Sequence, residues 1–61
     1  MTKKEQIILA TLELASQNGL GAVSMGQIAD RLGIRKPSLY NHFESKEAII
    51  AAMYEYLRER S

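Results

Sequence analysis

Residues 27–46 are QIADRLGIRKPSLYNHFESK, and this stretch decides the fold of the chain. Its pattern predicts a short amphipathic helix, a tight turn at Gly33 and a second short helix. Ser24 and Gln27 form a capping-box pattern that starts the first of these helices. Gly33 ends it, because glycine adopts the left-handed backbone of a helix terminus without a steric cost. Two short helices joined in this way are typical of a helix-turn-helix, whose second helix enters the major groove of DNA.

The second helix of the pair is predicted to begin near Lys36 and to continue through residue 42. Pro37 is tolerated in its first turn, because first-turn N–H groups have no partner inside a helix. Leu39 and Phe43 are four residues apart and share one face, so we expect both side chains to point into the core. The remaining residues of this helix must then face outward.

The outward face of this helix is unusual for plain solvation, because ordinary exposed helix positions favour Glu, Lys, Gln and Ala. Asn and Lys reach base edges, Ser, Tyr and His donate to phosphate, and Pro and Tyr rings contact a thymine methyl group. The face consists of Pro37, Ser38 and Asn41, flanked by Tyr40 and His42, with Lys36 at the start of the helix. It fits a nucleic-acid surface.

Four short segments carry a resemblance to a known family. They are Ile28-Ala29, Leu32-Gly33-Ile34, Leu39-Tyr40-Asn41-His42-Phe43 and Ser45-Lys46-Glu47. Their spacing resembles that of the N-terminal DNA-binding domain of TetR-type bacterial transcriptional regulators, and the likeness covers nearly all of the chain. It implies an all-α fold, a three-helix bundle with a helix-turn-helix plus the start of a fourth helix. It also implies sequence-specific binding of double-stranded DNA.

The candidate DNA contacts combine the outward residues with those implied by the resemblance. We expect base contacts from Lys36, Pro37 and Tyr40. Contacts near phosphates are expected from Ser38, Asn41, His42, Lys46, Arg35 and Ser24, with Gln27 as a further candidate.

Two positions depart from the family pattern. Arg35 stands where the family often has a capping Ser or Thr, so it is expected to reach phosphate or base instead. Gly26 stands where some TetR-like proteins carry a base-contacting side chain. Two interpretations of Gly26 stay open, namely neutral drift and a close approach of the backbone to phosphate, and glycine there lowers helix stability.

Composition bounds the remaining possibilities. Sixty-one residues without cysteine make one small domain without disulfides, and no apolar run reaches the length of a membrane span. Net charge is only +1 overall, but residues 31–46 hold four basic residues and one acid. A positive patch beside the outward helix suits phosphate. The single histidine makes a poor metal site, and no catalytic group or cofactor motif is present, so we expect no enzyme activity, metal or cofactor.

Helices are predicted over about 3–17, 25–32, 36–42 and 46–59, in one DNA-binding domain covering residues 1–61. The last helix has an apolar arc too wide for one neighbour, so the chain is expected to be a fragment. The resemblance implies a missing C-terminal domain that binds an unidentified inducer and forms a homodimer. The function expected is a cytoplasmic, nucleoid-associated bacterial repressor on a palindromic operator. The alternative is a helical protein-interaction module on the same scaffold.

Overall fold

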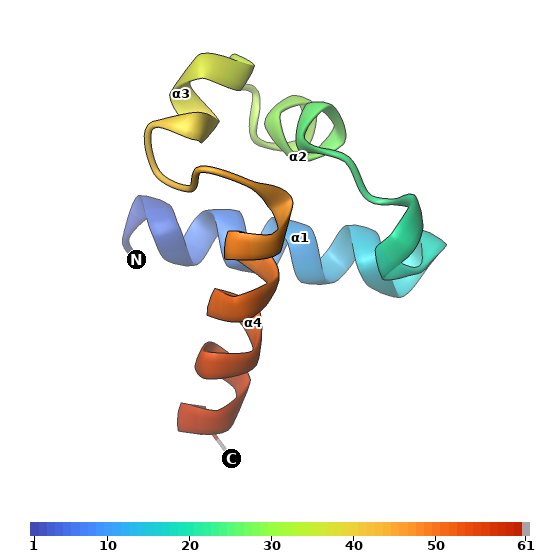
Figure 1. Cartoon of the computed structure of the whole chain (residues 1–61), viewed down its shortest axis with the longest axis vertical. Coiled ribbons are helices and arrows are strands. Elements are labelled where there is room, and N and C mark those ends of the chain that lie inside the picture. The colour runs from blue at the N-terminus through green and yellow to red at the C-terminus, as the bar shows by residue number, and fades with distance from the viewer. Residues whose placement is uncertain (61) are drawn as a thin grey trace.

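The computed structural model describes residues 1–60 and is all-α over that range. Its elements are α1 (Lys3–Asn18), the 3₁₀ turn η1 (Leu20–Ala22), α2 (Met25–Leu32), α3 (Lys36–Tyr40) and α4 (Lys46–Arg60), arranged as in Figure 1. This confirms the predicted fold class, three short helices with a helix-turn-helix followed by a fourth helix.

Local sequence signals set the starts of the helices. Thr2 and Glu5 form a reciprocal capping box at α1, with hydrogen bonds of 2.9 and 3.1 Å. Ser24 and Gln27 form the same arrangement at α2, with bonds of 3.1 and 3.2 Å. Each box satisfies two backbone N–H groups that the first turn of a helix leaves without partners.

The turn between α2 and α3 depends on Gly33, which has φ 69° and ψ 30°. A side chain is strained in this left-handed region, so glycine suits the position. The N–H of Ile34 returns to the carbonyl of Ala29 at 3.0 Å, which closes the end of α2. The chain then leaves the turn at a fixed angle and starts α3.

One large side chain from each helix is fully buried, and together they form the centre of the core. They are Ile7, Ile28, Leu39 and Ile49. Both α2 and α4 pack against α1, while α3 packs mainly on α2. In Figure 1, α2 and α3 lie at one end of the molecule and the C-terminal part of α4 extends to the other. The helix-turn-helix is therefore held at one end of the bundle.

The helix α3 is shorter than the predicted range, ending at Tyr40 rather than residue 42. The N–H of Asn41 donates to the carbonyls of both Pro37 and Ser38. The N–H of His42 donates to the carbonyl of Leu39, three residues back. Bonds to the third residue back tighten the last turn, as is common at helix ends. Asn41 and His42 thus lie on a turn that continues the helix axis.

Phe43 is only partly buried and packs against the core from its edge, whereas the sequence predicted a side chain pointing into the core. Its outer ring face is covered by Lys4 of α1, whose ammonium lies 5.6 Å from the ring centre. The ring follows the end of α3 in the chain and packs against the core cluster from outside it. Leu39 alone anchors α3 in the interior.

Among residues 1–60, no helix is both long and apolar enough to cross a membrane.

Candidate nucleic-acid interface

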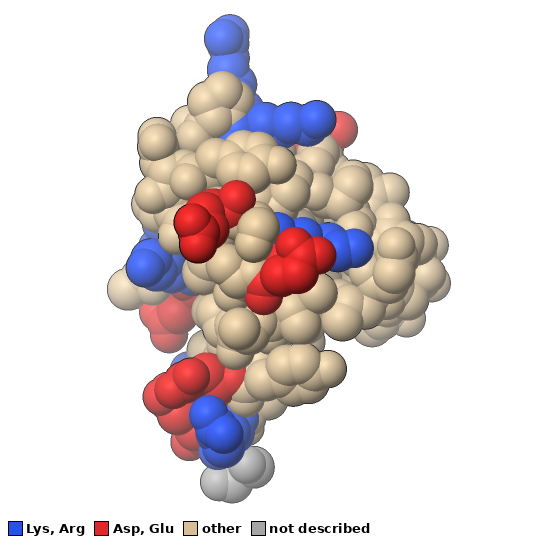
Figure 2. Space-filling view, viewed as in Figure 1, with Lys and Arg blue, Asp and Glu red and all other residues tan. Residues whose placement is uncertain are grey.

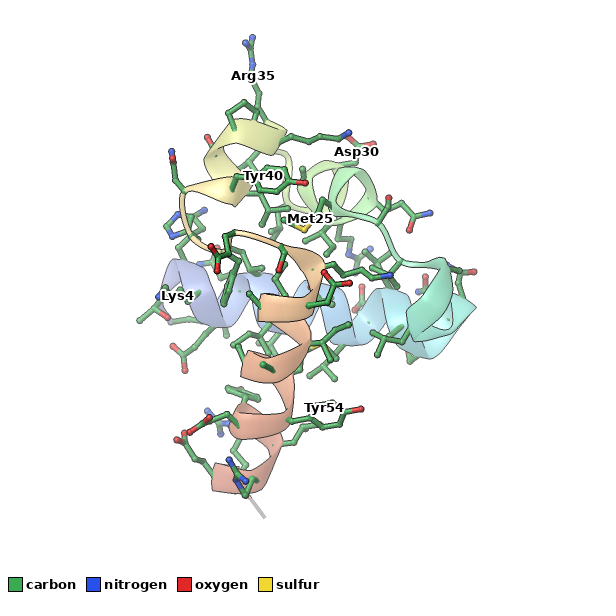
Figure 3. All side chains as sticks on the ribbon, in the orientation of Figure 1. Lys4, Met25, Asp30, Arg35, Tyr40 and Tyr54 are labelled. Carbon is green, nitrogen blue, oxygen red and sulfur yellow. The ribbon has the colours of Figure 1, made fainter. Side chains whose placement is uncertain are left out.

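The outer surface of α3 is built around its single buried residue. Leu39 has no exposed surface, while the four other residues of the helix are all exposed. Those four are Lys36, Pro37, Ser38 and Tyr40, and Tyr40 keeps 48% of its surface accessible. Arg35 before the helix and Asn41 after it are exposed as well. In Figure 3, Arg35 points away from the body of the molecule, and Tyr40 lies on α3.

The start of α2 contributes a second group of exposed polar side chains. Ser24 Oγ accepts the N–H of Gln27, and Gln27 Oε1 accepts the N–H of Ser24. Capping therefore uses the acceptor oxygens of both side chains and leaves the Ser24 hydroxyl hydrogen and the Gln27 amide hydrogens. Both residues are exposed, so these donors are available to a phosphate or a base edge.

A contact that the sequence did not predict joins the starts of α2 and α3. The side chain of Lys36 lies over Gly26, where a β-carbon would be 3.1 Å from Lys36 Cε and 3.7 Å from Nζ. The two residues are ten positions apart and on different helices. No periodicity or spacing in the sequence relates them, because only the angle between the helices brings them together.

Lys46, for which a phosphate contact is predicted, also donates hydrogen bonds inside the domain. Its ammonium donates to the carbonyl of Val23 at 2.9 Å and to that of Leu20 at 3.4 Å, and the side chain is partly buried. These carbonyls belong to the connection that leads into α2. Lys46 thus ties the first residue of α4 to the segment before α2, and one ammonium hydrogen remains for a phosphate.

Fewer basic side chains near α3 lack a partner inside the domain than the sequence predicted. Arg31, which the sequence placed in the positive patch, forms an ion pair with Glu13 of α1. Arg35 and Lys36 have no hydrogen-bond or ion-pair partner within residues 1–60. Figure 2 shows Lys and Arg side chains extending from the end of the molecule that carries α3. Among the four basic residues of residues 31–46, the two without a partner in the described part of the chain are therefore those at the start of α3.

The ten candidate residues lie between the start of α2 and the start of α4, and they differ in accessibility. Eight of them are exposed, whereas His42 and Lys46 are partly buried. The eight are Ser24, Gln27, Arg35, Lys36, Pro37, Ser38, Tyr40 and Asn41. The candidates come from α2, α3, the turn after α3 and the start of α4. A convex helix flanked by polar donors can bind a groove and the backbone on either side of it.

No group of three or more His, Cys, Asp or Glu side chains that could hold a metal ion occurs in the described part of the chain. A carboxylate with a lowered pKa lies at the start of α1. There, hydrogen bonds from the backbone and then the side chain of Thr2 lower the pKa of Glu5.

Comparisons with known proteins agree with this geometry. The sequence model for "Bacterial regulatory proteins, tetR family" matches residues 7–53, which include all ten candidate residues. The chain is 41% identical over 63 residues to the tetracycline repressor protein class G of Vibrio anguillarum, covering 98% of this chain and 30% of that protein.

Two further relatives have similar levels of identity. The uncharacterized HTH-type transcriptional regulator YerO of Bacillus subtilis is 41% identical over 54 residues, or 88% of this chain and 19% of that protein. The HTH-type transcriptional activator FasR of Mycolicibacterium smegmatis is 38% identical over 53 residues, or 87% and 24%. The chain thus spans less than a third of the length of each of these relatives. No solved structure matches.

Proposed function

Because this chain belongs to the TetR family of bacterial regulatory proteins, we propose that it binds double-stranded DNA sequence-specifically by placing α3 in the major groove. The observation that carries the proposal is the division of α3 into one buried anchor and an exposed polar surface. Leu39 fixes the helix on the bundle, while its five nearest exposed neighbours, residues 36–38, 40 and 41, are left for a ligand. A protruding helix of this kind matches the width of the major groove.

The proposed contacts divide into base and backbone contacts. Lys36, Pro37 and Tyr40 are the proposed base contacts among the exposed residues of α3, because a lysine ammonium reaches a base edge and the Pro and Tyr rings can contact a thymine methyl group. The phosphate contacts come from residues that flank the helix or lie at its outer edge. They are Ser24, Arg35, Ser38, Asn41, His42 and Lys46, with Gln27 as a further contact from α2. Contacts on both sides would fix the orientation of α3 in the groove.

A single copy of this domain should bind DNA weakly, because few uncompensated cations lie at the start of α3. We propose that two copies bind a palindromic operator, with their α3 helices about 34–36 Å apart in successive major grooves. Such a homodimer would be held by a further C-terminal domain, as the greater length of the relatives supports.

The surface of α4 supports such a further domain. Tyr54 and Leu57 leave 66% and 46% of their surfaces exposed. Apart from Met1 and Tyr40, these are the exposed large hydrophobic side chains among residues 1–60. Figure 3 shows Tyr54 on the part of the molecule away from α3. An apolar surface remote from the DNA face suits contact with more protein.

We propose that the complete protein is a cytoplasmic repressor, released from DNA when a small-molecule inducer binds the C-terminal domain. Relatives include proteins named as repressors and one named as an activator. Repression and activation can be distinguished with a reporter gene whose promoter carries the DNA sequence that the protein binds. Repression predicts that deleting the regulator raises reporter expression, whereas activation predicts a fall.

The experiment that tests DNA binding is selection of duplexes from a randomised library, followed by affinity measurements on the selected duplex at several salt concentrations. Two of the proposed phosphate contacts in each copy, Arg35 and Lys46, are cations, and they predict a slope of log K against log[salt] of about −2. No detectable binding at low salt and high protein concentration would refute DNA binding. It would favour a protein-interaction module instead.

A further inference from the structure

Gly26 and Lys36 form a contact between α2 and α3 at the edge of the DNA-binding surface. The far end of the Lys36 side chain lies beside Gly26, and a β-carbon there would lie 3.1 Å from Lys36 Cε and 3.7 Å from Nζ. The first separation is shorter than an ordinary van der Waals contact between carbon atoms. A β-carbon at position 26 would therefore require the end of the lysine side chain to shift by a few tenths of an ångström.

The atoms that a β-carbon at position 26 would approach belong to the end of a flexible side chain. Because that side chain can shift, the fold itself does not need glycine at this position. The residue has no positive φ, unlike Gly19 and Gly33. It lies in the first turn of α2, where glycine is less favourable for a helix than alanine. Neither backbone geometry nor helix stability accounts for glycine at this position, and the lysine beside it is the neighbour that its missing β-carbon accommodates.

The Lys36 ammonium is free to bind a ligand. It has no hydrogen-bond or ion-pair partner in the part of the chain that the structure describes. A free lysine side chain loses rotamer freedom when it binds, which lowers its affinity for the ligand. A lysine side chain whose end already lies against α2 loses less of that freedom, so the contact pre-organises the ammonium.

We propose that Gly26 is a positioning residue for DNA recognition, which holds the Lys36 side chain against α2 and so directs its ammonium to one base pair. The inference rests on the proposed function, because it takes Lys36 to be a base contact. It differs from the interpretation in which glycine lets the backbone approach a phosphate. In that case Gly26 acts independently of Lys36, whereas here it acts only through Lys36.

The test is a double-mutant cycle on the duplex selected by the unmodified chain. Lys36→Ala should weaken binding about tenfold and flatten the preference at one base pair. Gly26→Ala should weaken it about threefold and flatten the preference at the same base pair, because its methyl group displaces the lysine. Gly26→Ala should add less than about a twofold loss to Lys36→Ala, because the two act on one contact.

Folding serves as the control, because Gly26→Ala should leave the Tm unchanged or raise it. Losses that multiply in the double variant would overturn the inference, since they would show that Gly26 acts without the lysine. A base preference unchanged by Gly26→Ala would also overturn it. A fall in Tm that accounts for the lost binding would overturn it as well.

A measurement without DNA separates this inference from the proposed function. In the NMR spectrum of the free chain, the contact predicts a nuclear Overhauser effect between the Gly26 α-protons and the Lys36 ε-protons. Its absence while the unmodified chain selects DNA would overturn the role of Gly26 alone. Its presence while no DNA is selected would leave the contact in place and refute the function on which the inference rests.

Discussion

Leu39 and Tyr40 are adjacent on α3, and their substitution by alanine should separate folding from DNA binding. Leu39 has no exposed surface, whereas Tyr40 leaves 48% of its surface exposed. Leu39→Ala should strongly destabilise the domain. Tyr40→Ala should leave it folded and weaken its binding to the selected duplex.

The expected magnitudes follow from burial. Leu39→Ala removes apolar atoms from a closed site and leaves a cavity, which costs about 2–5 kcal/mol. A domain of this size has a free energy of unfolding of roughly 3–9 kcal/mol, at about 0.05–0.15 kcal/mol per residue. The substitution therefore removes a large share of the total and lowers the Tm by at least about 10 °C. Tyr40 is only about half buried, so Tyr40→Ala should lower the free energy of unfolding by only about 1 kcal/mol.

The assay is thermal melting followed by circular dichroism, with affinity for the selected duplex measured well below both melting temperatures. We expect about a tenfold loss of affinity for Tyr40→Ala, which corresponds to the loss of one base contact. The reasoning would be refuted if Tyr40→Ala melted as early as Leu39→Ala. It would also be refuted if Tyr40→Ala bound the duplex as tightly as the unmodified chain.

Three further predictions follow from contacts seen in the structure. Lys46→Met removes the ammonium that donates to the Val23 carbonyl, while the Leu20 carbonyl keeps the N–H of Val23 as a donor. The variant should therefore lower the free energy of unfolding by about 1–2 kcal/mol even without DNA, whereas the matched Lys36→Met should not change it. Equal melting curves for the two variants would contradict this role for Lys46. Phe43→Ala should cost less than the buried leucine does, about 1–3 kcal/mol by urea unfolding, because the ring is only partly buried. Hydrogen bonds from Thr2 lower the pKa of Glu5 in the folded state, so the stability they add is complete above the unfolded-state pKa and is lost as the pH falls through the folded-state pKa. Glu5→Gln keeps the acceptor without the titration, and melting as a function of pH should show a smaller acid-side loss for this variant; identical pH profiles would exclude the effect.

The sequence alone determined the parts of the structure that depend on near neighbours along the chain. Ser24 and Gln27 are three residues apart, so the capping box of α2 follows from helix geometry and local hydrogen bonding. The turn at Gly33 follows from the conformational freedom of glycine. The burial of Leu39 and the exposure of residues 36–38 follow from the helical repeat. Those local rules were sufficient to predict the all-α fold and the exposed surface of α3.

Only the tertiary structure decided which side chains from different helices meet. Arg31 pairs with Glu13 of α1, and Lys46 donates to carbonyls before α2, so two of the four cations counted near α3 have partners inside the domain. The contact between the Lys36 side chain and Gly26 likewise joins two different helices. These contacts depend on the angles and distances between packed helices, which are set by the shapes of the buried side chains together. A periodicity measured along one helix contains no information about them.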